Sequence, residues 1–393
     1  MRFNFFMPRP RRLLLPTTVL AAGLLLFSCH QEQTGTDTSS DFSGVASDSS
    51  RIQLHPQYAR GFEITYRNGY ALLSLHDPQQ EKGTVTQFAL VPRGTRPKIT
   101  EKCELIEVPL RSVICMTSLQ LSNFIALEQT GRVKGITSTR HLRNARMREQ
   151  LRNGTTHKIG IEGNFDNEVI MSIAPDAIFI SPYKRGGYDA LRDVGTPLIP
   201  HFGYKETTPL GQAEWIKCIG VLTGCEQQAD SLFNAIAEHY RQLCELASAV
   251  TERPVVFSGE MQGGHWYAVG GRSFLAELFR DAGADYFLKD DTRSGGVTLD
   301  FEEVYSIAAT ADYWRILNSY DGVFDYEALK AEDARYADFH AWKSHGVLYC
   351  NQREVPFYES TPVQPDIVLA DLIKAFHPEL LPDHEPQFYK LLK

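Results

Sequence analysis

The longest helical pattern in the sequence divides the chain into two stretches of similar organisation. In "EQQADSLFNAIAEHYRQLCELASAV" (226–250), apolar residues recur every three or four positions and mark one face of a helix, which Pro254 ends. On either side, short apolar runs alternate with helical patterns, as in "NEVIMSIAPDAIFIS" and "LDFEEVYSIAATADYWRIL". Such alternation predicts βαβ units and mostly parallel sheets. We therefore expect an α/β protein with two Rossmann-like lobes joined by a single long helix.

A short phrase occurs once in each stretch. "EVIMSIAPDA" (168–177) and "EEVYSIAATA" (302–311) lie 134 positions apart and agree at five of ten positions. The matched pairs are Glu168 and Glu302, Ser172 and Ser306, Ile173 and Ile307, Ala174 and Ala308, and Ala177 and Ala311. Each copy is predicted to be a helix that precedes a strand. Two similar lobes explain the repeat, and coincidence among common residues is the alternative.

The first residues indicate export. Four arginines precede an apolar run from Leu13 to Phe27, and Ser28 and Cys29 follow it. This is the pattern of a secretory signal, and the run is shorter than the about 20 residues that span a bilayer. "LFSC" resembles a bacterial lipobox, which implies lipidation of Cys29 and attachment to a membrane at the cell envelope, facing the periplasm. Phe27 departs from the small residue usual there, so an ordinary cleaved signal is the alternative.

Composition then divides the chain into segments. The Ser-, Thr-, Gly- and Asp-rich stretch after Cys29 cannot bury a core and is typical of a flexible linker. Further on, Asn68-Gly69 between β-prone runs predicts a hairpin. We expect a lipoprotein signal peptide (1–28), a linker (29–57), an N-terminal lobe with a strand-rich extension that contains the β-hairpin (58–225), a bridging helix (226–252) and a C-terminal lobe (253–393).

Charge and cysteine content exclude some functions. Without residues 1–28 the chain has a net charge of about −12 by simple counting, so nucleic acid is an unsuitable partner. Besides Cys29, six cysteines remain, none in a zinc-site pattern. Disulfides are permitted outside the cytosol. Cys103 with Cys115 and Cys218 with Cys225 are the nearest candidates, and the spacing does not decide the pairing.

The order of several stretches resembles a known family. "NEVIMSIAPDAIFIS", "VGGRSFLAELFRDAGADYF" and "LDFEEVYSIAATADYW" occur as in substrate-binding proteins of ABC importers that carry iron-siderophores, haem or cobalamin, whose two lobes are joined by one rigid helix. The resemblance runs from about Arg111 to the C-terminus. The later stretches, with "VQPDIVLADLIKAFHPELLPDH", are similar to a lipoprotein branch common in Bacteroidetes. The resemblance to this importer family implies a protein that is not an enzyme, has no covalent cofactor and binds a metal chelate as cargo.

The resemblance also implies a docking mode. In this family an acidic residue on each lobe enters arginine pockets of the paired permease subunits, and Glu168 and Glu302 occupy the matching positions here. Glu303 takes the place of Glu302 if the register shifts by one. The alternative is that each glutamate only complements the dipole of its helix.

Cargo is expected between the lobes, where the loops after strand ends converge. The candidate ligand-binding residues are Thr117, Ser118, Asn164, Phe165, Tyr183, Arg185, His201, Tyr204, His265, Trp266, Tyr267, Arg272, Arg353, Phe357 and Tyr358. Trp266 and Tyr267, flanked by glycine pairs, suit stacking on a flat ligand. Arg272 and the start of the next helix suit an anionic group. His265, His201 or Met261 is a candidate ligand of haem iron. Core packing is the alternative for each aromatic residue.

Three other functions stay open. Asp300, Glu302 and Glu303 offer an acid/base pair for a membrane-tethered hydrolase or chelatase, although the chain contains no HExxH, GxSxG or P-loop motif. A receptor for bare zinc or manganese is the second alternative, and it needs three or four converging His, Asp or Glu ligands. The third is a surface lipoprotein that captures cargo without a permease.

Overall fold

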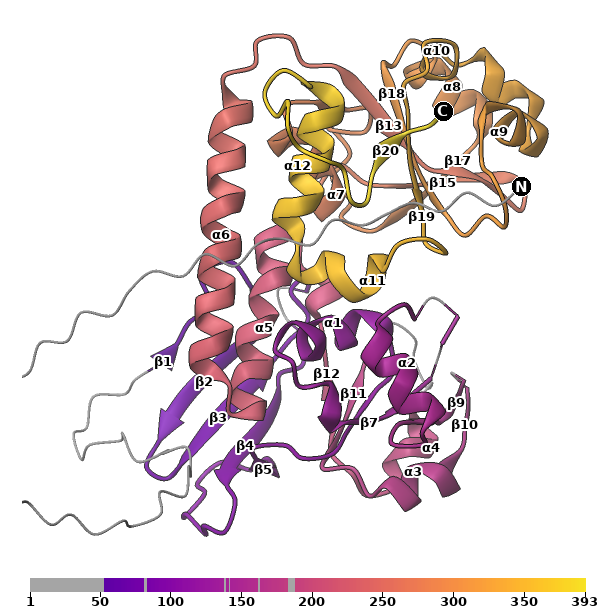
Figure 1. The fold of residues 1–393 in the computed structure, drawn as a ribbon. Helices are drawn as coiled ribbons and strands as arrows, with labels where there is room; N and C mark the ends of the chain where they lie inside the picture. Colours follow the sequence, from indigo (N-terminus) through magenta and orange to yellow (C-terminus); the bar gives the residue numbers. More distant parts are fainter. Residues whose placement is uncertain (1–52, 81–82, 138, 141, 162, 183–187) are drawn as a thin grey trace, which may run out of the picture. The chain divides into compact units, whose positions relative to one another are not determined.

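Five parallel strands form the sheet of the N-terminal half, residues 113–223. The structure is a computed structural model that describes residues 53–80, 83–137, 139–140, 142–161, 163–182 and 188–393. The strand order is β12-β11-β6-β7-β8. The strands are β6 (Val113–Cys115), β7 (Val133–Ile136), β8 (His157–Lys158), β11 (Ala177–Ile180) and β12 (Leu198–Pro200), and the helices are α1 (Ser118–Ala126), α2 (Ala145–Arg152), α3 (Asn167–Ile173) and α4 (Asp189–Arg192). The predicted βαβ alternation is confirmed here (Figure 1).

The C-terminal half, residues 255–391, repeats this plan with an addition. Its main sheet has the order β16-β13-β18-β19-β20, parallel except for β20. These strands are β13 (Val255–Ser258), β16 (Asp285–Tyr286), β18 (Tyr313–Asn318), β19 (Val347–Asn351) and β20 (Lys390–Leu391). The helices are α7 (Phe274–Asp281), α8 (Phe301–Ala308), α9 (Tyr326–Glu332), α10 (His340–Lys343), α11 (Phe357–Ser360) and α12 (Pro365–Phe376). A separate antiparallel sheet of β14 (Glu260–Gln262), β15 (His265–Val269) and β17 (Gly296–Leu299) was not anticipated from the sequence.

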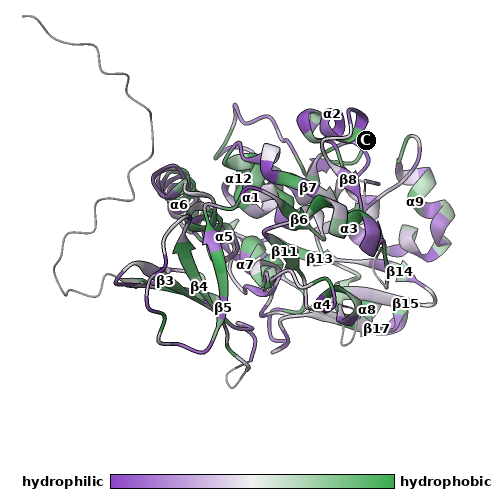
Figure 2. Cartoon of the chain, turned by 90° about the horizontal axis from the view of Figure 1, so that it is seen from below, coloured by the Kyte–Doolittle hydropathy of each residue, from purple (hydrophilic) through white to green (hydrophobic). Residues whose placement is uncertain are grey.

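The segment before residue 111 is rich in strands, as predicted, and contains the predicted hairpin. The hairpin itself is confirmed, with Arg67 opposite Tyr70 across Asn68-Gly69, but it belongs to a five-stranded sheet. The strands are β1 (Gln53–Leu54), β2 (Phe62–Arg67), β3 (Tyr70–Leu75), β4 (Thr86–Pro92) and β5 (Glu104–Val108). β1 lies inside the segment predicted to be linker, 29–57, so the linker boundary is corrected to before Gln53. Figure 2 shows β3 and β4 coloured mainly as hydrophobic, as strands that face a core must be.

Two buried carboxylates fasten this N-terminal sheet to the rest of the protein. Glu214 on α5 (Pro209–Thr223) accepts the backbone N–H groups of residues 57–59 at 2.7–2.9 Å. Glu206 accepts those of Arg60 and Gly61, and also the Trp215 indole N–H at 2.9 Å. Hydrogen bonds to a charged acceptor are stronger than neutral ones. The sheet is therefore held against α5 by oriented backbone bonds in addition to apolar packing.

The long helix α6 (Glu226–Ser248) forms where the sequence predicts it, and it packs on α5 and α12 (Figure 1). Its buried face includes Phe233, Tyr240 and Leu243, as the periodicity predicts. Gly220 permits the close approach of α5, because a Cβ there would lie 2.6 Å from the Ala229 methyl. The bridging helix is thus one member of a packed layer. None of the helices among the described residues is long and apolar enough to cross a membrane.

One hydrophobic core runs through both halves. Val113 and Cys115 of β6 and Val256 of β13 belong to the same buried cluster as α5, α6, α7 and α12. The opposite faces pack separately, since Ile114 belongs to a second cluster and Phe257 to a third. Alternate residues of a strand point to opposite faces of its sheet, which explains the split. Residues 51–393 accordingly form a single compact unit, and the division into two lobes at the bounds given above stays a prediction.

The cysteines of the described residues do not form disulfides. Cys103, Cys115, Cys218, Cys225, Cys244 and Cys350 are all free thiols. The two candidate pairings, Cys103 with Cys115 and Cys218 with Cys225, are therefore wrong for this structure. Burial raises the pKa of the Cys218 thiol to about 12, which makes it a poor nucleophile at neutral pH. Cys29 lies outside the described residues.

Candidate functional site

Polar side chains gather at the carboxyl ends of the parallel strands in the C-terminal half. Asn318 ends β18, and its amide donates to Glu260 Oε1 at 3.3 Å while its oxygen accepts from the Tyr349 hydroxyl at 2.9 Å. After β19, Gln352 accepts from the Ser319 hydroxyl at 3.2 Å and donates to the Tyr358 hydroxyl at 3.1 Å. Because these strands are parallel, the groups share one edge of the sheet, where ligands of such folds bind. We call this set the carboxyl-edge network.

Arg353 and Tyr358, two of the predicted ligand-binding residues, lie in or beside this network. The Arg353 Nε donates to the Ser319 carbonyl at 2.8 Å, and its Nη1 lies 3.2 Å from the exposed Asp321 carboxylate. Glu260, Asn318 and Gln352 were missed in the sequence. Asn318 follows the stretch "LDFEEVYSIAATADYWRIL" and Gln352 follows β19, so a search restricted to polar residues at strand ends would have found them.

Glu260 is the most strongly perturbed acid of the network. Burial raises the pKa of its carboxyl to about 7, and the charge of Glu332 adds to the rise, while the Asn318 hydrogen bond and the Arg315 charge oppose it. At neutral pH this group therefore exists in both protonation states. It can donate or accept a hydrogen bond toward a bound molecule.

The corresponding edge of the N-terminal half is built around Gln120. Its side-chain oxygen accepts the backbone N–H of Met116 at 2.7 Å, and its amide donates to the Ser181 hydroxyl at 3.0 Å. Thr117 and Ser118 lie between, at the start of α1, and are half-buried. These bonds join the ends of β6 and β11 and fix the backbone at the predicted positions Thr117 and Ser118.

The remaining predicted residues of the N-terminal half lie in several environments. Asn164 is exposed on the short strand β10 (Asn164–Phe165), and Phe165 stacks on Tyr188 with ring centroids 6.1 Å apart. Tyr204 is half-buried, and burial and the Asp77 charge raise the pKa of its hydroxyl. Tyr183 and Arg185 fall outside the described residues.

His201 is a core residue in this structure. Its ring contacts that of Trp215 in a tilted arrangement, with ring centroids 4.5 Å apart, and its Nε2 lies 3.4 Å from the Asn123 side-chain nitrogen. Burial lowers the pKa of its imidazole to about 4. Of the other candidate iron ligands, His265 is exposed with Nδ1 3.4 Å from Asp300, and Met261 packs against the core of the C-terminal half. Met261 and His265 lie on the paired strands β14 and β15, whereas His201 follows β12 in the N-terminal half.

The structure corrects the predicted role of Trp266 and Tyr267, because β15 places the two side chains on opposite faces of its sheet. On β15, His265 and Tyr267 face outward, whereas Trp266 has no exposed surface and donates its indole N–H to the Ser258 carbonyl at 3.0 Å. The prediction that both rings stack on a ligand is therefore wrong for Trp266. Tyr267, 46% exposed, keeps an accessible ring.

The glycine pair before α7 serves packing within the protein. A Cβ at Gly271 would lie 2.2 Å from the Leu288 carbonyl oxygen, so the loop of residues 288–293 occupies the space beside it. Ser273 caps α7 by accepting the Ala276 N–H at 3.2 Å. Arg272 is exposed, and its backbone N–H donates to the Arg293 carbonyl. The prediction that a flat ligand approaches this glycine pair is therefore wrong, because neighbouring backbone fills the space. Phe357 likewise packs on Phe388 and Tyr389.

Both copies of the repeated phrase begin as a helix at the same position and precede a strand, although α3 ends at Ile173 and α8 continues to Ala308. α3 begins at Asn167 and α8 at Phe301, 134 positions apart, so Glu168 and Glu302 are each the second residue of a helix. Both glutamates are exposed. The Ser172 hydroxyl donates to the carbonyl of residue 169 and the Ser306 hydroxyl to that of residue 303, each at 2.7 Å. One difference is that Glu302 lies 3.6 Å from Arg335.

A family model described as "Periplasmic binding protein" matches residues 113–354. The matched segment holds both halves' main parallel strands and the helices α3, α6 and α8. The chain belongs to the periplasmic binding protein family. This segment begins at β6, so the N-terminal sheet of β1 to β5 lies outside the family match.

Relatives of this periplasmic binding protein include two uncharacterised lipoproteins of Methanocaldococcus jannaschii. One is 24% identical over 76% of this chain and 73% of its own length, and the other is 22% identical over 98% and 100%. Among solved structures, a haem-binding periplasmic protein of Pseudomonas aeruginosa has a TM-score of 0.57 at 16% identity, with 72% of this chain and 98% of that chain covered. The molybdate-binding protein MolA of Haemophilus influenzae has a TM-score of 0.56 at 16% identity, covering 71% and 90%. These likenesses establish the fold.

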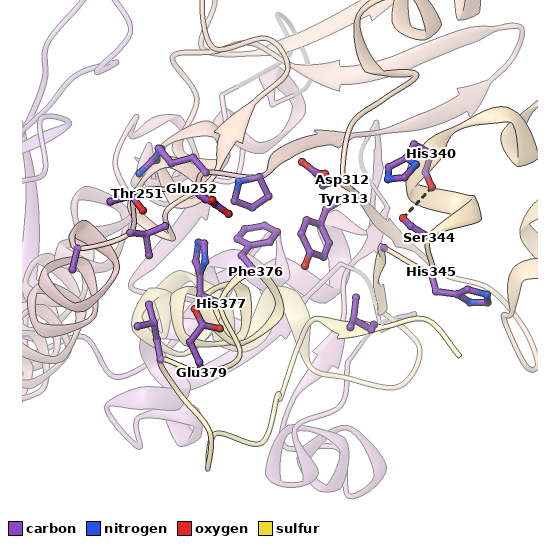
Figure 3. Close-up of a pocket in the computed structure, with 17 residues that line it drawn as sticks. Thr251, Glu252, Asp312, Tyr313, His340, Ser344, His345, Phe376, His377 and Glu379 are labelled. Carbon is purple, nitrogen blue, oxygen red and sulfur yellow. Dashed lines mark hydrogen bonds between the residues drawn. The ribbon is translucent and has the colours of Figure 1, made fainter.

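Two cavities are lined by described residues of this periplasmic binding protein. A cavity of about 30 Å³ is lined by Pro209 and Gln212 of α5, by Arg315, and by Phe357 and Tyr389, so it sits where elements of both halves meet. A much larger one, about 930 Å³, lies at the amino ends of β13, β18 and β19, away from the carboxyl-edge network (Figure 3). Within the part of the chain that the structure describes, no group of three or more His, Cys, Asp or Glu side chains is arranged to hold a metal ion.

Proposed function

We propose that this protein is a lipid-anchored receptor that captures a metal chelate and delivers it to an ABC importer permease. The chelate is an iron-siderophore, haem or a cobalamin, and Cys29 carries the lipid that keeps the receptor at the membrane of the cell envelope, facing the periplasm. The resemblance to the Bacteroidetes lipoprotein branch is part of this proposal. Family members bind small molecules and work with ABC permeases, which supports the general scheme.

The observation that carries the proposal is the equivalence of Glu168 and Glu302. Both carboxylates are exposed at the second position of a helix, and each helix precedes a strand of a parallel sheet. Two carboxylates at a fixed separation complement a permease dimer that offers one basic pocket per subunit, and opposite charges speed and orient such encounters.

The carboxyl-edge network supports binding of a polar chelate in the C-terminal half. Tyr267, Arg353 and Tyr358 supply an exposed ring, a guanidinium and a phenol for the oxygen atoms and flat faces of such a ligand. Thr117 and Ser118 belong to the opposing edge of the N-terminal half. Because the halves share a core with α6, we propose that closure on the cargo is small.

The test is direct binding. The purified protein is titrated with haem, cobalamin and ferric chelates, and visible absorbance and tryptophan fluorescence are recorded. We expect tight saturable binding of one class, with Arg353→Gln and Tyr358→Phe weakening it. If none of the three classes binds, or if the variants leave the affinity of the bound class unchanged, the proposed cargo and site are overturned.

A further inference from the structure

One cavity among the described residues is not used by the proposed function. It measures about 930 Å³, a volume in the range of sites that bind small molecules. It lies where α6 passes into β13 and where β18 and β19 begin, at the edge of the sheet opposite the carboxyl-edge network. A molecule bound there would therefore not compete with cargo at the network.

The floor of this cavity is aromatic. Tyr313 of β18 and Phe376 of α12 meet edge to face, with ring centroids 5.0 Å apart. Figure 3 shows the two rings side by side among the lining residues. Tyr313 is half-buried, so part of its ring is available to a ligand. An aromatic face attracts cations through its quadrupole.

The polar groups around the floor are mainly acceptors. Glu252 and Glu379 are exposed carboxylates for which the described residues give no cationic partner within 4 Å, and Asp312 uses Oδ2 to accept the Val255 N–H at 2.8 Å. Burial and the charges of Asp312 and Glu379 raise the pKa of the Tyr313 hydroxyl, so both carboxylates act on this ring.

The buried imidazole of His377 adds a further acceptor. It is 6% exposed, and its Nε2 lies 3.1 Å from the Gly283 carbonyl, so Nε2 carries the proton. In the neutral ring Nδ1 is then an acceptor, and no hydrogen bond to it is made by the described residues.

The guanidinium that lines the cavity does not neutralise these carboxylates, because it is bound to other groups. Arg253 is held by Asp285 at 3.0 Å and by the carbonyls of Arg280 and Ala284. His340 and His345 are exposed side chains that also line the cavity. Three carboxylates thus face one guanidinium that is already bound elsewhere.

We propose that this cavity is a second ligand site, which binds a small organic cation such as a polyamine or a guanidinium compound. The cationic groups of the ligand bond Glu379, Asp312 and His377, and its alkyl chain packs over Tyr313 and Phe376. A bare metal ion does not suit the cavity, since the described residues converge in no metal-ligand set. The site is independent of the proposed chelate site.

The experiment is calorimetric titration with spermidine and with agmatine, at fixed ionic strength. We expect saturable binding at one site per protein. Glu379→Gln and Tyr313→Leu are each expected to weaken binding about fivefold or more, whereas Tyr313→Phe, which keeps the ring, changes it by less than about threefold. The matched control is Glu245→Gln, which removes an equal charge from the exposed face of α6 outside the cavity.

Two results would overturn the site. One is the absence of saturation by either probe at millimolar concentration. The other is a loss in Glu245→Gln equal to that in Glu379→Gln, which would mean that the probes respond only to net charge. Thermal unfolding of each variant without ligand verifies the fold, and Tyr313→Phe keeps the test valid if Tyr313→Leu is destabilised. Chelate binding in Glu379→Gln is expected to equal that of the wild type. The test of the cavity therefore does not depend on whether the proposed chelate site is correct.

Discussion

The Glu359 carboxylate accepts the backbone N–H of Asn144 at 2.8 Å, across 215 positions of sequence. Glu359 lies in α11, after the last parallel strand of the C-terminal half, and Asn144 caps α2 in the N-terminal half. The same carboxylate accepts the Arg143 N–H at 2.5 Å and is almost fully buried. A single side chain thus ties the two halves together through backbone groups.

We expect Glu359→Ala to destabilise the protein by about 2–4 kcal/mol, because two backbone donors lose a charged acceptor in a buried place. Urea unfolding followed by circular dichroism measures this. The control is Glu245→Ala, an exposed change expected to stay within about 0.5 kcal/mol. If Glu359→Ala behaves like the control, the carboxylate does not join the halves in solution.

His201 is expected to make stability fall in acid. Its pKa is about 4 in the folded protein, against 6.5 in an unfolded chain. Below pH 6.5 the unfolded chain binds a proton at this imidazole, whereas the folded protein does not. The free energy of unfolding therefore falls by about 3 kcal/mol as the pH falls from about 6.5 to about 4. NMR should show no titration of the His201 ring between pH 5 and 8. A midpoint near 6.5 would contradict its buried place beside Trp215.

Glu260 is expected to act in the opposite direction. Its pKa is raised from 4.5 to about 7, so the folded protein holds a proton that the unfolded chain releases. Stability from this group is full below about 4.5 and is lost as the pH rises to about 7, again by about 3 kcal/mol. Glu260→Gln should remove that loss. Unfolding free energies at pH 5 and 7.5 measure it, and equal slopes in the variant and the wild type would refute the shift.

Reversing the charge of Glu168 or Glu302 is expected to lower uptake without changing cargo affinity. An arginine at either position repels a basic pocket on the permease, so transport should fall about tenfold or more in Glu168→Arg and in Glu302→Arg. Uptake by cells and binding by the purified variants are measured together. Glu303→Arg, on the adjacent position of α8, is the control for register. An equal fall in that variant, or none in the first two, argues against docking through this pair.

Local signals in the sequence accounted for most elements of the fold. Asn68-Gly69 predicted its turn because left-handed backbone is needed there, and the periodicity of 226–250 predicted α6 with its buried face. The site was less predictable. Trp266 and Tyr267 are neighbours with similar chemistry, yet the pleat of β15 buries one and exposes the other. Similarly, Glu260 and Asn318 are 58 positions apart, and only the parallel pairing of β13 and β18 brings them to one edge.

The sequence by itself determined most of the helices and strands of the two halves, the buried face of α6, and that one α/β plan occurs twice. These properties depend on interactions between residues close together in the chain. The tertiary structure alone decided which face of each strand meets a core, that a five-stranded sheet is fastened to α5 by Glu206 and Glu214, and that a cavity of about 930 Å³ lies at the amino ends of the strands. Those depend on contacts between distant residues, whose partners no local pattern specifies.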